Sequence, residues 1–319
     1  MFKKSLLDRF KIFSCALLAI SLAACAGSRP DINIPATQPN TNLSIPQPRV
    51  ALVLSGGGVR GFAHIGVIKA LQEAGVPIDL IGGTSAGSIV GALYADQANI
   101  NDVETSIKSV SLFNILDFNN IPRSQGVLQG YKLQKFLLQH MKAKTFDQLK
   151  IPLIVVATDL KTGAPVQLDS GPIAPAVQAS AAIPALFDPV SLYGYELIDG
   201  GMSDPIAVDF VQPYHPKLII AVNVAEQLPS KIPSTAEGIY NRAFIIMRLN
   251  MSEMSARGAD VIITPAVGTT QMFDIDKKTQ LIHDGELAAQ KALPEIKRLL
   301  KEHGIPLNPP TAKTEENGR

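Results

Sequence analysis

Short apolar runs along the chain alternate with segments in which apolar residues recur every three or four positions. Most runs are three to eight residues long and stop at a turn-forming or polar residue, which is typical of strands buried in a sheet. The runs lie at 50–54, 78–81, 151–158, 196–198, 217–224 and 260–264. The helical spacing predicts helices over 62–74, 86–97, 101–110, 131–141, 173–182, 235–257 and 284–303.

The order of these elements predicts the fold class. Residues 50–97 read as strand, glycine-rich loop, helix, strand, turn and helix, so we expect parallel pairing with right-handed crossovers. We therefore predict an α/β fold with an open, mostly parallel central sheet covered by helices on both faces. Residues 114–129 contain Pro122 and Gly126 and fit neither pattern, so we expect an irregular, mobile loop there.

Composition narrows the classes of function. The chain has 319 residues, 46% hydrophobic and 18% charged, which suits one large α/β domain or two smaller ones. A formal net charge of +1 provides no basic surface for nucleic acid. We place one folded domain at 49–305 and expect the polar, proline-rich residues 306–319 to be a disordered tail.

The N-terminal residues look like an export signal. Four basic residues precede an apolar run at 12–24 that is too short to span a bilayer comfortably. Leu22-Ala23-Ala24-Cys25 resembles a bacterial lipobox, so we expect 1–24 to be a lipoprotein signal peptide and Cys25 to be lipidated. An ordinary signal peptide with a cysteine near its cleavage site is the alternative.

Cleavage there has consequences for the mature chain. Cys15 lies in the segment removed, so Cys25 would be the sole cysteine and no internal disulfide could form. Residues 25–48 are rich in proline and small polar residues, and we expect a flexible tether. Acyl chains on Cys25 would anchor the protein in the cell envelope. Ala26 after the cysteine favours the outer membrane, facing the periplasm.

The stretch Gly83-x-Ser85-x-Gly87 follows the pattern of a nucleophile elbow. This pattern holds a serine on a sharp turn between a strand and a helix, where side chains at the two glycine positions would collide with neighbouring backbone. Ser85 would also lie near a helix N-terminus, which favours an anion. The bare pattern also occurs in simple turns, so it needs support from elsewhere in the chain.

Two further stretches could complete a site with Ser85. The glycines Gly56, Gly57 and Gly58 allow backbone N–H groups to approach an oxyanion. Asp199 ends a predicted strand, which is where sites form in open α/β sheets. A Walker A loop is excluded because no Gly-Lys-Ser/Thr follows, and the glycines are not spaced as in a dinucleotide-binding loop. Asp-Gly-Gly alone is most often a turn.

Taken together, these motifs resemble the patatin-like phospholipase family. The motifs that carry the resemblance are Gly56-Gly57-Gly58-x-Arg60-Gly61, Gly83-x-Ser85-x-Gly87 and Asp199-Gly200-Gly201. Further signatures in family order are His64-x-Gly66-Val67, Ala157-Thr158-Asp159-Leu160 and Ala179-Ser180-x-Ala182-Ile183-Pro184. The resemblance covers roughly 49–213. Ser55 stands where many family members have aspartate, which leaves the glycine core intact.

The resemblance implies a Ser-Asp catalytic dyad. Ser85 would be the nucleophile and Asp199 the base, with an oxyanion hole formed by backbone N–H groups of the glycine loop, from Gly56 to Val59. Arg60 would position this loop. The residues alone leave a Ser-Asp-His triad open, with His215, His283 or His303 as the base. We interpret His64 as a packed, hydrogen-bonded structural residue.

On this basis we expect a serine lipid acyl hydrolase that cleaves phospholipids or other acyl lipids of the membrane through an acyl-enzyme. A dyad of this kind needs no metal or cofactor, and no cluster has metal-ligand spacing. An acyltransferase or thioesterase on the same dyad is one alternative. A catalytically silent envelope lipoprotein that binds lipid is another. The sequence leaves head group and oligomeric state open.

Overall fold

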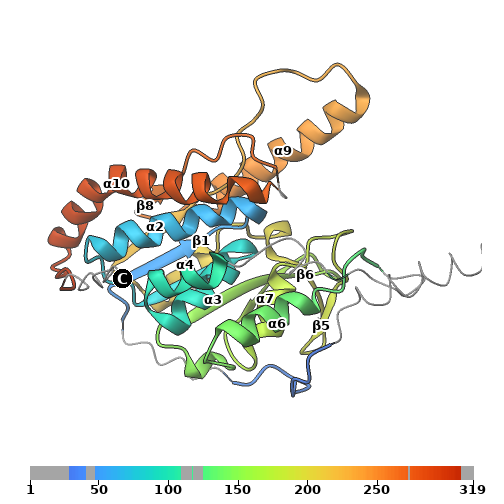
Figure 1. Cartoon of the computed structure of the whole chain (residues 1–319), viewed down its shortest axis with the longest axis horizontal. Coiled ribbons are helices and arrows are strands. Elements are labelled where there is room, and N and C mark those ends of the chain that lie inside the picture. The colour runs from blue at the N-terminus through green and yellow to red at the C-terminus, as the bar shows by residue number, and fades with distance from the viewer. Residues whose placement is uncertain (1–28, 41–46, 109–116, 118–124, 272–273, 310–319) are drawn as a thin grey trace, which may run out of the picture.

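The structure is a computed structural model, and it describes residues 29–40, 47–108, 117, 125–271 and 274–309. Its centre is a mixed sheet whose strand order is β5-β6-β3-β2-β1-β7-β8, with β4 paired to β3 (Figure 1). The strands are β1 (Val50–Leu54), β2 (Leu80–Thr84), β3 (Leu153–Asp159), β4 (Pro165–Leu168), β5 (Val190–Leu192), β6 (Tyr195–Asp199), β7 (Leu218–Val222) and β8 (Val261–Ile263).

Strands β3, β2, β1, β7 and β8 pair in parallel, whereas β4, β5 and β6 join them by antiparallel pairing. The mostly parallel sheet predicted from the apolar runs is confirmed. Side chains of β1 alternate between two apolar clusters, as the pleat of a strand requires. Val50, Leu52 and Leu54 face one cluster, and Ala51 and Val53 face the other.

Helices cover the two faces unequally. Most of them contribute to the larger apolar cluster, while α8 and the end of α9 cover the other face. The helices are α2 (Phe62–Glu73), α3 (Ala86–Gln97), α4 (Ile100–Lys108), α6 (Tyr131–His140), α7 (Ile173–Ser180), α8 (Val208–Val211), α9 (Ala236–Ser255) and α10 (Lys278–Glu302). Helices α2 and α10 lie side by side, and a Cβ at Gly66 would come within 1.8 Å of the Ile282 carbonyl oxygen.

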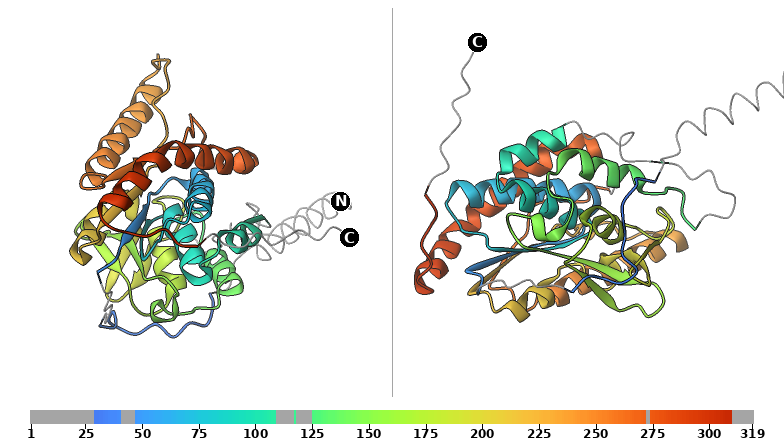
Figure 2. Two further views of the ribbon diagram at one scale, coloured as in Figure 1. Left: turned by 90° about the vertical axis from the view of Figure 1, so that its left-hand side faces the viewer. Right: turned by 90° about the horizontal axis from the view of Figure 1, so that it is seen from below.

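Helix α9 projects from the body of the domain (Figures 1 and 2). Large apolar side chains on it are exposed, including Ile239, Tyr240, Phe244 and Met247. Only Ser252, near its C-terminal end, is buried. No helix in the described part of the chain is long and apolar enough to span a bilayer.

Several elements differ from the sequence prediction. Strands β4 and β5 and helix α8 were not predicted, because each has only three or four residues and polar residues interrupt its apolar ones. Helix α10 begins at Lys278 rather than at 284. Its first turns were not predicted because buried Leu281 stands among mostly polar residues in the sequence. Most of the loop expected at 114–129 lies outside the described residues.

The strand that carries Asp199 runs opposite to the expected direction. β5 and β6 form a hairpin whose two loop residues, Tyr193 and Gly194, both have positive φ, of 54° and 84°. Such a two-residue turn reverses the chain directly. β6 therefore enters the sheet antiparallel to β3, and Asp199 does not lie at the carboxyl edge of a parallel strand.

Both expected flexible ends make contacts with the domain. In the segment predicted as a tether, Ile32 and Ile34 pack against the larger core cluster and Ser170 Oγ donates to the Pro39 carbonyl at 2.7 Å. In the segment predicted as a tail, the Asn308 N–H donates to the Gly75 carbonyl at 2.7 Å. These contacts explain why 29–40 and 306–309 follow the domain surface. Cys25 and residues 310–319 lie outside the described residues.

Candidate active site

Ser85 occupies the sharp turn between β2 and α3 that its motif predicts. Its backbone has φ 51° and ψ −120°, a conformation that is strained for a residue with a side chain. The neighbouring glycines make room for this turn: a Cβ at Gly87 would lie 2.1 Å from the Leu54 carbonyl oxygen, and one at Gly83 would lie 2.8 Å from Ser88 Cα. The turn therefore forms only with glycine at both positions.

A second serine holds the backbone of this turn. The Ser85 N–H donates to Ser180 Oγ at 2.8 Å, and the Ser180 hydroxyl donates to the Val156 carbonyl at 2.6 Å. On the helical side, the Ser85 carbonyl accepts hydrogen bonds from the N–H and the hydroxyl of Ser88. The hydrogen-bonding groups of the strained backbone are thus satisfied by neighbours in α3, α7 and β3.

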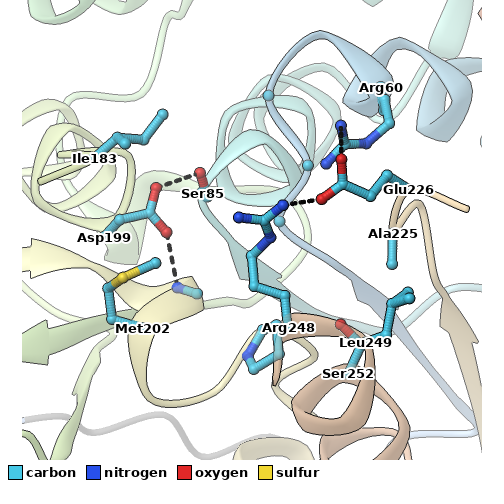
Figure 3. A pocket seen from close by; sticks show the side chains of 15 residues that line it. Arg60, Ser85, Ile183, Asp199, Met202, Ala225, Glu226, Arg248, Leu249 and Ser252 are labelled. Atoms are coloured by element: carbon cyan, nitrogen blue, oxygen red, sulfur yellow. Dashed lines mark hydrogen bonds and ion pairs between the residues drawn. The ribbon is translucent and has the colours of Figure 1, made fainter. Parts of the chain in front are cut away.

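The Ser85 hydroxyl donates to Asp199 Oδ2 at 2.6 Å (Figure 3). Both side chains are buried, with exposed fractions of 5% and 4%. The other carboxylate oxygen, Oδ1, accepts the Gly201 N–H at 2.7 Å, and Thr158 Oγ1 donates to the Asp199 carbonyl at 2.9 Å. Asp199 is therefore held from two sides, with Oδ2 directed at the serine.

Burial raises the pKa of Asp199 to about 6, against the lowering effect of the hydrogen bonds from Ser85 and Gly201. Removing water from a carboxylate disfavours its charged form, which makes it a stronger base. A carboxylate with a pKa near neutrality is suited to accept a proton from a hydroxyl group. The burial of Asp199 thus accounts for the basicity that a dyad requires.

The register of the sheet brings the two residues together. Thr84 pairs with Val156 on β3, so Ser85 lies level with Ala157. Ala157 in turn pairs with Asp199 on β6. The serine and the aspartate thus lie at the same height on either side of β3. The structure thus brings together the two residues that the sequence placed in one site, although β6 is not the parallel strand from which that prediction was reasoned.

The glycine loop offers fewer free donors than predicted. The N–H of Gly56 donates to the Pro205 carbonyl at 3.1 Å, so Gly56 does not belong to an oxyanion hole. Among the described residues, the N–H groups of Gly57 and Gly58 donate to no protein acceptor, and both residues line the pocket at Ser85. Gly58 has φ 58°, which favours glycine. Val59 follows in the first turn of a 3-10 helix, Gly58–Gly61.

Arg60 is buried and bonded to backbone. Its Nε donates to the Val224 carbonyl and its Nη1 to the Thr270 carbonyl, both at 3.0 Å. These contacts tie the glycine loop to the segment that follows β7 and to the segment that follows β8. The other motif glycines also sit at close approaches: a Cβ at Gly61 would meet Ala86 Cβ at 2.6 Å, and one at Gly200 would meet the Val156 carbonyl oxygen at 2.2 Å.

Two pockets meet at Ser85. One has a volume of about 170 Å³ and an almost wholly apolar wall, and we call it the apolar pocket; it is lined by Val59, Phe62, Ile89, Leu133, Phe136 and Phe187 among others. The other has a volume of about 150 Å³, and we call it the arginine pocket; it is lined by Arg60, Asp199, Glu226, Arg248 and Ser252 among others (Figure 3). Gly58, Ser85 and Ile183 line both.

The histidines do not support a triad. All five lie in the described part of the chain, and none lines either pocket. His64 is fully buried, its Nε2 lies 2.8 Å from the Ser55 carbonyl oxygen, and burial lowers its pKa to about 4. It is the structural residue expected from the sequence. His215 ends a short 3-10 helix, and His283 and His303 lie on or beside α10.

Sequence reasoning did not identify three residues of the site. Ser180, which holds the Ser85 backbone, stands in one of the quoted signatures but had no role assigned. Glu226 and Arg248 come from the segment after β7 and from α9, and no local pattern marks them. The described residues contain no group of three or more His, Cys, Asp or Glu side chains that could hold a metal ion.

The sequence of the chain is similar to a known protein family and to several known proteins. The model of the family described as patatin-like phospholipase matches residues 52–211, half of the chain, and this range contains Ser85 and Asp199. An uncharacterized NTE family protein of Mycobacterium tuberculosis is 38% identical over 178 residues, covering 56% of this chain and 49% of that protein. A protein named lysophospholipase nte1 from Aspergillus fumigatus is 33% identical over 180 residues, covering 55% and 12%.

The chain therefore spans about half the length, or less, of these two relatives. Among solved structures, VipD from Legionella pneumophila matches with a TM-score of 0.52 over 87% of this chain and 72% of that one, at 15% identity. This likeness concerns the fold, which agrees with the mixed sheet described above. Together with the match of the family model, the sequence similarity establishes that the chain belongs to the patatin-like phospholipase family.

Proposed function

We propose that this protein is a serine lipid acyl hydrolase that cleaves acyl esters of membrane lipids through a dyad of Ser85 and Asp199. The observation that carries the proposal is the 2.6 Å hydrogen bond from the Ser85 hydroxyl to a buried carboxylate, at the junction of two pockets. Membership of the patatin-like phospholipase family supports the same reaction class.

In the first half of the reaction, Asp199 Oδ2 takes the hydroxyl proton as Ser85 Oγ attacks the ester carbonyl carbon. The carbonyl oxygen becomes an oxyanion, which the N–H groups of Gly57 and Gly58, without a protein acceptor among the described residues, can stabilise. The bond between the carbonyl carbon and the alcohol oxygen then breaks. Asp199 returns its proton to the departing alcohol, which leaves an acyl group on Ser85.

In the second half, a water molecule takes the place of the alcohol. Asp199 accepts one proton of this water as its oxygen attacks the acyl-enzyme, and the same donors stabilise the second oxyanion. The bond to Ser85 Oγ breaks, and Asp199 returns the proton to the serine. The products are an alcohol, a fatty acid and the free enzyme, so atoms and charges balance over the cycle.

The apolar pocket provides a place for the acyl chain. Its volume of about 170 Å³ compares with an engineered protein cavity of about 150 Å³ that binds benzene. Aromatic and aliphatic side chains form its wall, and burying each CH₂ group of a chain there contributes about 0.8 kcal/mol. The fungal relative is named a lysophospholipase, so monoacyl phospholipids are the first substrates to try.

A product analysis tests this proposal. We expect the purified protein, incubated with a lysophospholipid in water enriched in ¹⁸O, to release fatty acid that carries the heavy oxygen. Ser85→Ala should reduce this release at least about 10³-fold. Ser191→Ala, an exposed serine that donates to Glu196, is the control and should leave the rate unchanged. Unchanged turnover in Ser85→Ala would contradict the dyad.

The same experiment separates the alternative of an acyltransferase. If the acyl group passes to another alcohol or to a thiol, the acylated acceptor accumulates and free fatty acid does not. A protein that binds the lysophospholipid tightly but forms neither fatty acid nor an acylated acceptor would be a silent lipid-binding protein.

We also propose that the protein is a lipoprotein of the bacterial envelope, anchored through acyl chains on Cys25. The support is the lipobox-like sequence alone. Metabolic labelling with an alkyne-bearing fatty acid should mark the wild-type protein and leave Cys25→Ala unmarked. Equal labelling of both would contradict the anchor.

A further inference from the structure

We propose that Arg248 binds a phosphate group on the alcohol side of the substrate, so that the arginine pocket is a leaving-group site for phosphate-bearing lipids. This inference rests on the function proposed above, because it assumes that Ser85 attacks an ester. It adds the chemical class of the leaving group and the residue that selects it.

The position of Ser85 between two unlike pockets is the first step. An ester has its acyl chain on one side of the carbonyl carbon and its alcohol on the other, so the two parts of the substrate leave the serine in different directions. The apolar pocket suits the acyl chain. The arginine pocket then remains for the alcohol, and it contains two guanidinium groups and the carboxylates of Glu226 and Asp199.

The two arginines are not equivalent. Arg60 is 6% exposed and donates to the carbonyls of Val224 and Thr270, and its Nη1 lies 3.9 Å from Glu226 Oε2. Its guanidinium is therefore engaged by the protein. Arg248 is nearly half exposed and pairs through Nη2 with the other oxygen of Glu226. Figure 3 shows its guanidinium on the Glu226 side of the pocket, with Ser85 and Asp199 across from it.

An arginine in this setting is suited to phosphate. A guanidinium group has five N–H donors in a planar fork that matches two oxygens of a phosphate. Among the described residues, Arg248 donates to Glu226 alone, so most of its donors are available to a ligand. Glu226 lies between the two arginines and orients the Arg248 guanidinium beside the pocket. A neutral alcohol would gain little from this arrangement.

Paired substrates with the same acyl chain test the inference. One is a lysophosphatidylcholine and the other a monoacylglycerol, both kept below their critical micelle concentrations. We expect Arg248→Gln to lower kcat/KM for the phosphate-bearing lipid about 10- to 100-fold, since hydrogen bonds between charged groups are strong. The value for monoacylglycerol should stay within about threefold. Arg248→Lys should be intermediate for the phosphate-bearing lipid, because lysine keeps the charge but loses the fork.

Arg242→Gln is the matched control. Arg242 lies on the same helix, donates to the carbonyls of Pro229 and Lys231, and does not line the pocket. This variant should leave kcat/KM unchanged for both lipids. Equal losses on both substrates in Arg248→Gln, or no loss on either, would overturn the inference while Ser85-dependent hydrolysis still stands. If the wild-type protein shows no turnover that depends on Ser85, the proposed function itself is contradicted.

A further arm separates lipid phosphate from free phosphate. Millimolar inorganic phosphate is added to the monoacylglycerol assay with the wild-type protein and with Arg248→Gln. Inhibition that requires Arg248, without any preference between the two lipids, would assign the site to a free anion and contradict the leaving-group role. Preference for the phosphate-bearing lipid that is lost in Arg248→Gln supports it.

Discussion

At the scale of single residues, the site depends on one carboxylate that folding has removed from water. Asp199 is 4% exposed, and its burial raises its pKa to about 6. The serine that it faces is held in a strained turn by Ser180 and by glycines that leave no room for a Cβ. Strain and buried charge are both unfavourable to folding, and they coincide at the residues proposed for catalysis.

The raised pKa predicts how activity depends on pH. Asp199 can act as a base only when it is ionised, so kcat/KM should be constant above about pH 7 and should fall about tenfold per pH unit well below pH 6. Asp204 is a second buried aspartate whose pKa is raised to about 6, chiefly by burial. Asp204→Asn should therefore keep the same pH profile. If the pH profile shifts in Asp204→Asn, the titration belongs to Asp204 and not to Asp199.

The same burial predicts an effect on stability. The folded-state pKa of Asp199 lies above its ordinary value of 3.8. The free energy of unfolding should therefore fall as the pH rises from about 4 to about 6, and it should stay lower above pH 6. Asp199→Asn should raise the free energy of unfolding at pH 8 by roughly 2–3 kcal/mol. Denaturant titrations at pH 8 and pH 4 measure the difference. A variant that is less stable than wild type at pH 8 would contradict this assignment.

At the scale of elements, side chains of the helices packed on the parallel strands are buried, whereas many side chains of helix α9 are exposed. Leu93 on α3 is fully buried in the larger cluster, whereas Phe244 on α9 is 43% exposed. Leu93→Ala should lower the free energy of unfolding by about 2–5 kcal/mol, because it leaves a cavity. Phe244→Ser should change it by less than about 1 kcal/mol. Chemical denaturation compares the two, and a larger loss for Phe244→Ser would mean that α9 packs more closely than described.

The sequence was most informative where an element is long or buried on both faces. The run at 50–54 and the helix at 86–97 agree with the structure to the residue. The run stops just before the glycine loop, and the helix begins directly after Ser85 in the elbow motif. The hairpin of β5 and β6 was missed, since β5 has three residues and its turn contains Tyr193 at positive φ. For this reason the direction of the strand that carries Asp199 could not be predicted.

The sequence predicted the residues of the site that stand in motifs, but not those that only the fold brings there. Ser85, Asp199 and the glycine loop stand in motifs that resemble those of the patatin-like phospholipase family, and it was this resemblance, rather than spacing alone, that implied their roles. Gly56 was wrongly included, because its bond to Pro205 depends on tertiary structure. Arg248 joins the site from α9, far along the chain, and only folding reveals that it faces Glu226 and the pocket.

At the scale of the whole molecule, the N-terminal segment is part of the packed structure. Ile32 and Ile34 rest on the core, and Gln38 Nε2 donates to Asp169 at 3.0 Å. A protein that begins at residue 41 should therefore be less stable than one that begins at residue 26, by about 1–3 kcal/mol from the lost apolar burial and hydrogen bonds. Thermal unfolding of the two proteins measures this, and equal midpoints would mean that the segment adds nothing to the fold.

The most direct test of the dyad is labelling by a fluorophosphonate, which reacts with activated serines. We expect mass spectrometry of the labelled wild-type protein to locate the adduct on Ser85. Labelling should be lost in Ser85→Ala and strongly reduced in Asp199→Asn, while His215→Ala, His283→Ala and His303→Ala label like the wild type. Full labelling of Asp199→Asn, or loss of labelling in one of the histidine variants, would contradict the dyad and point to a different base.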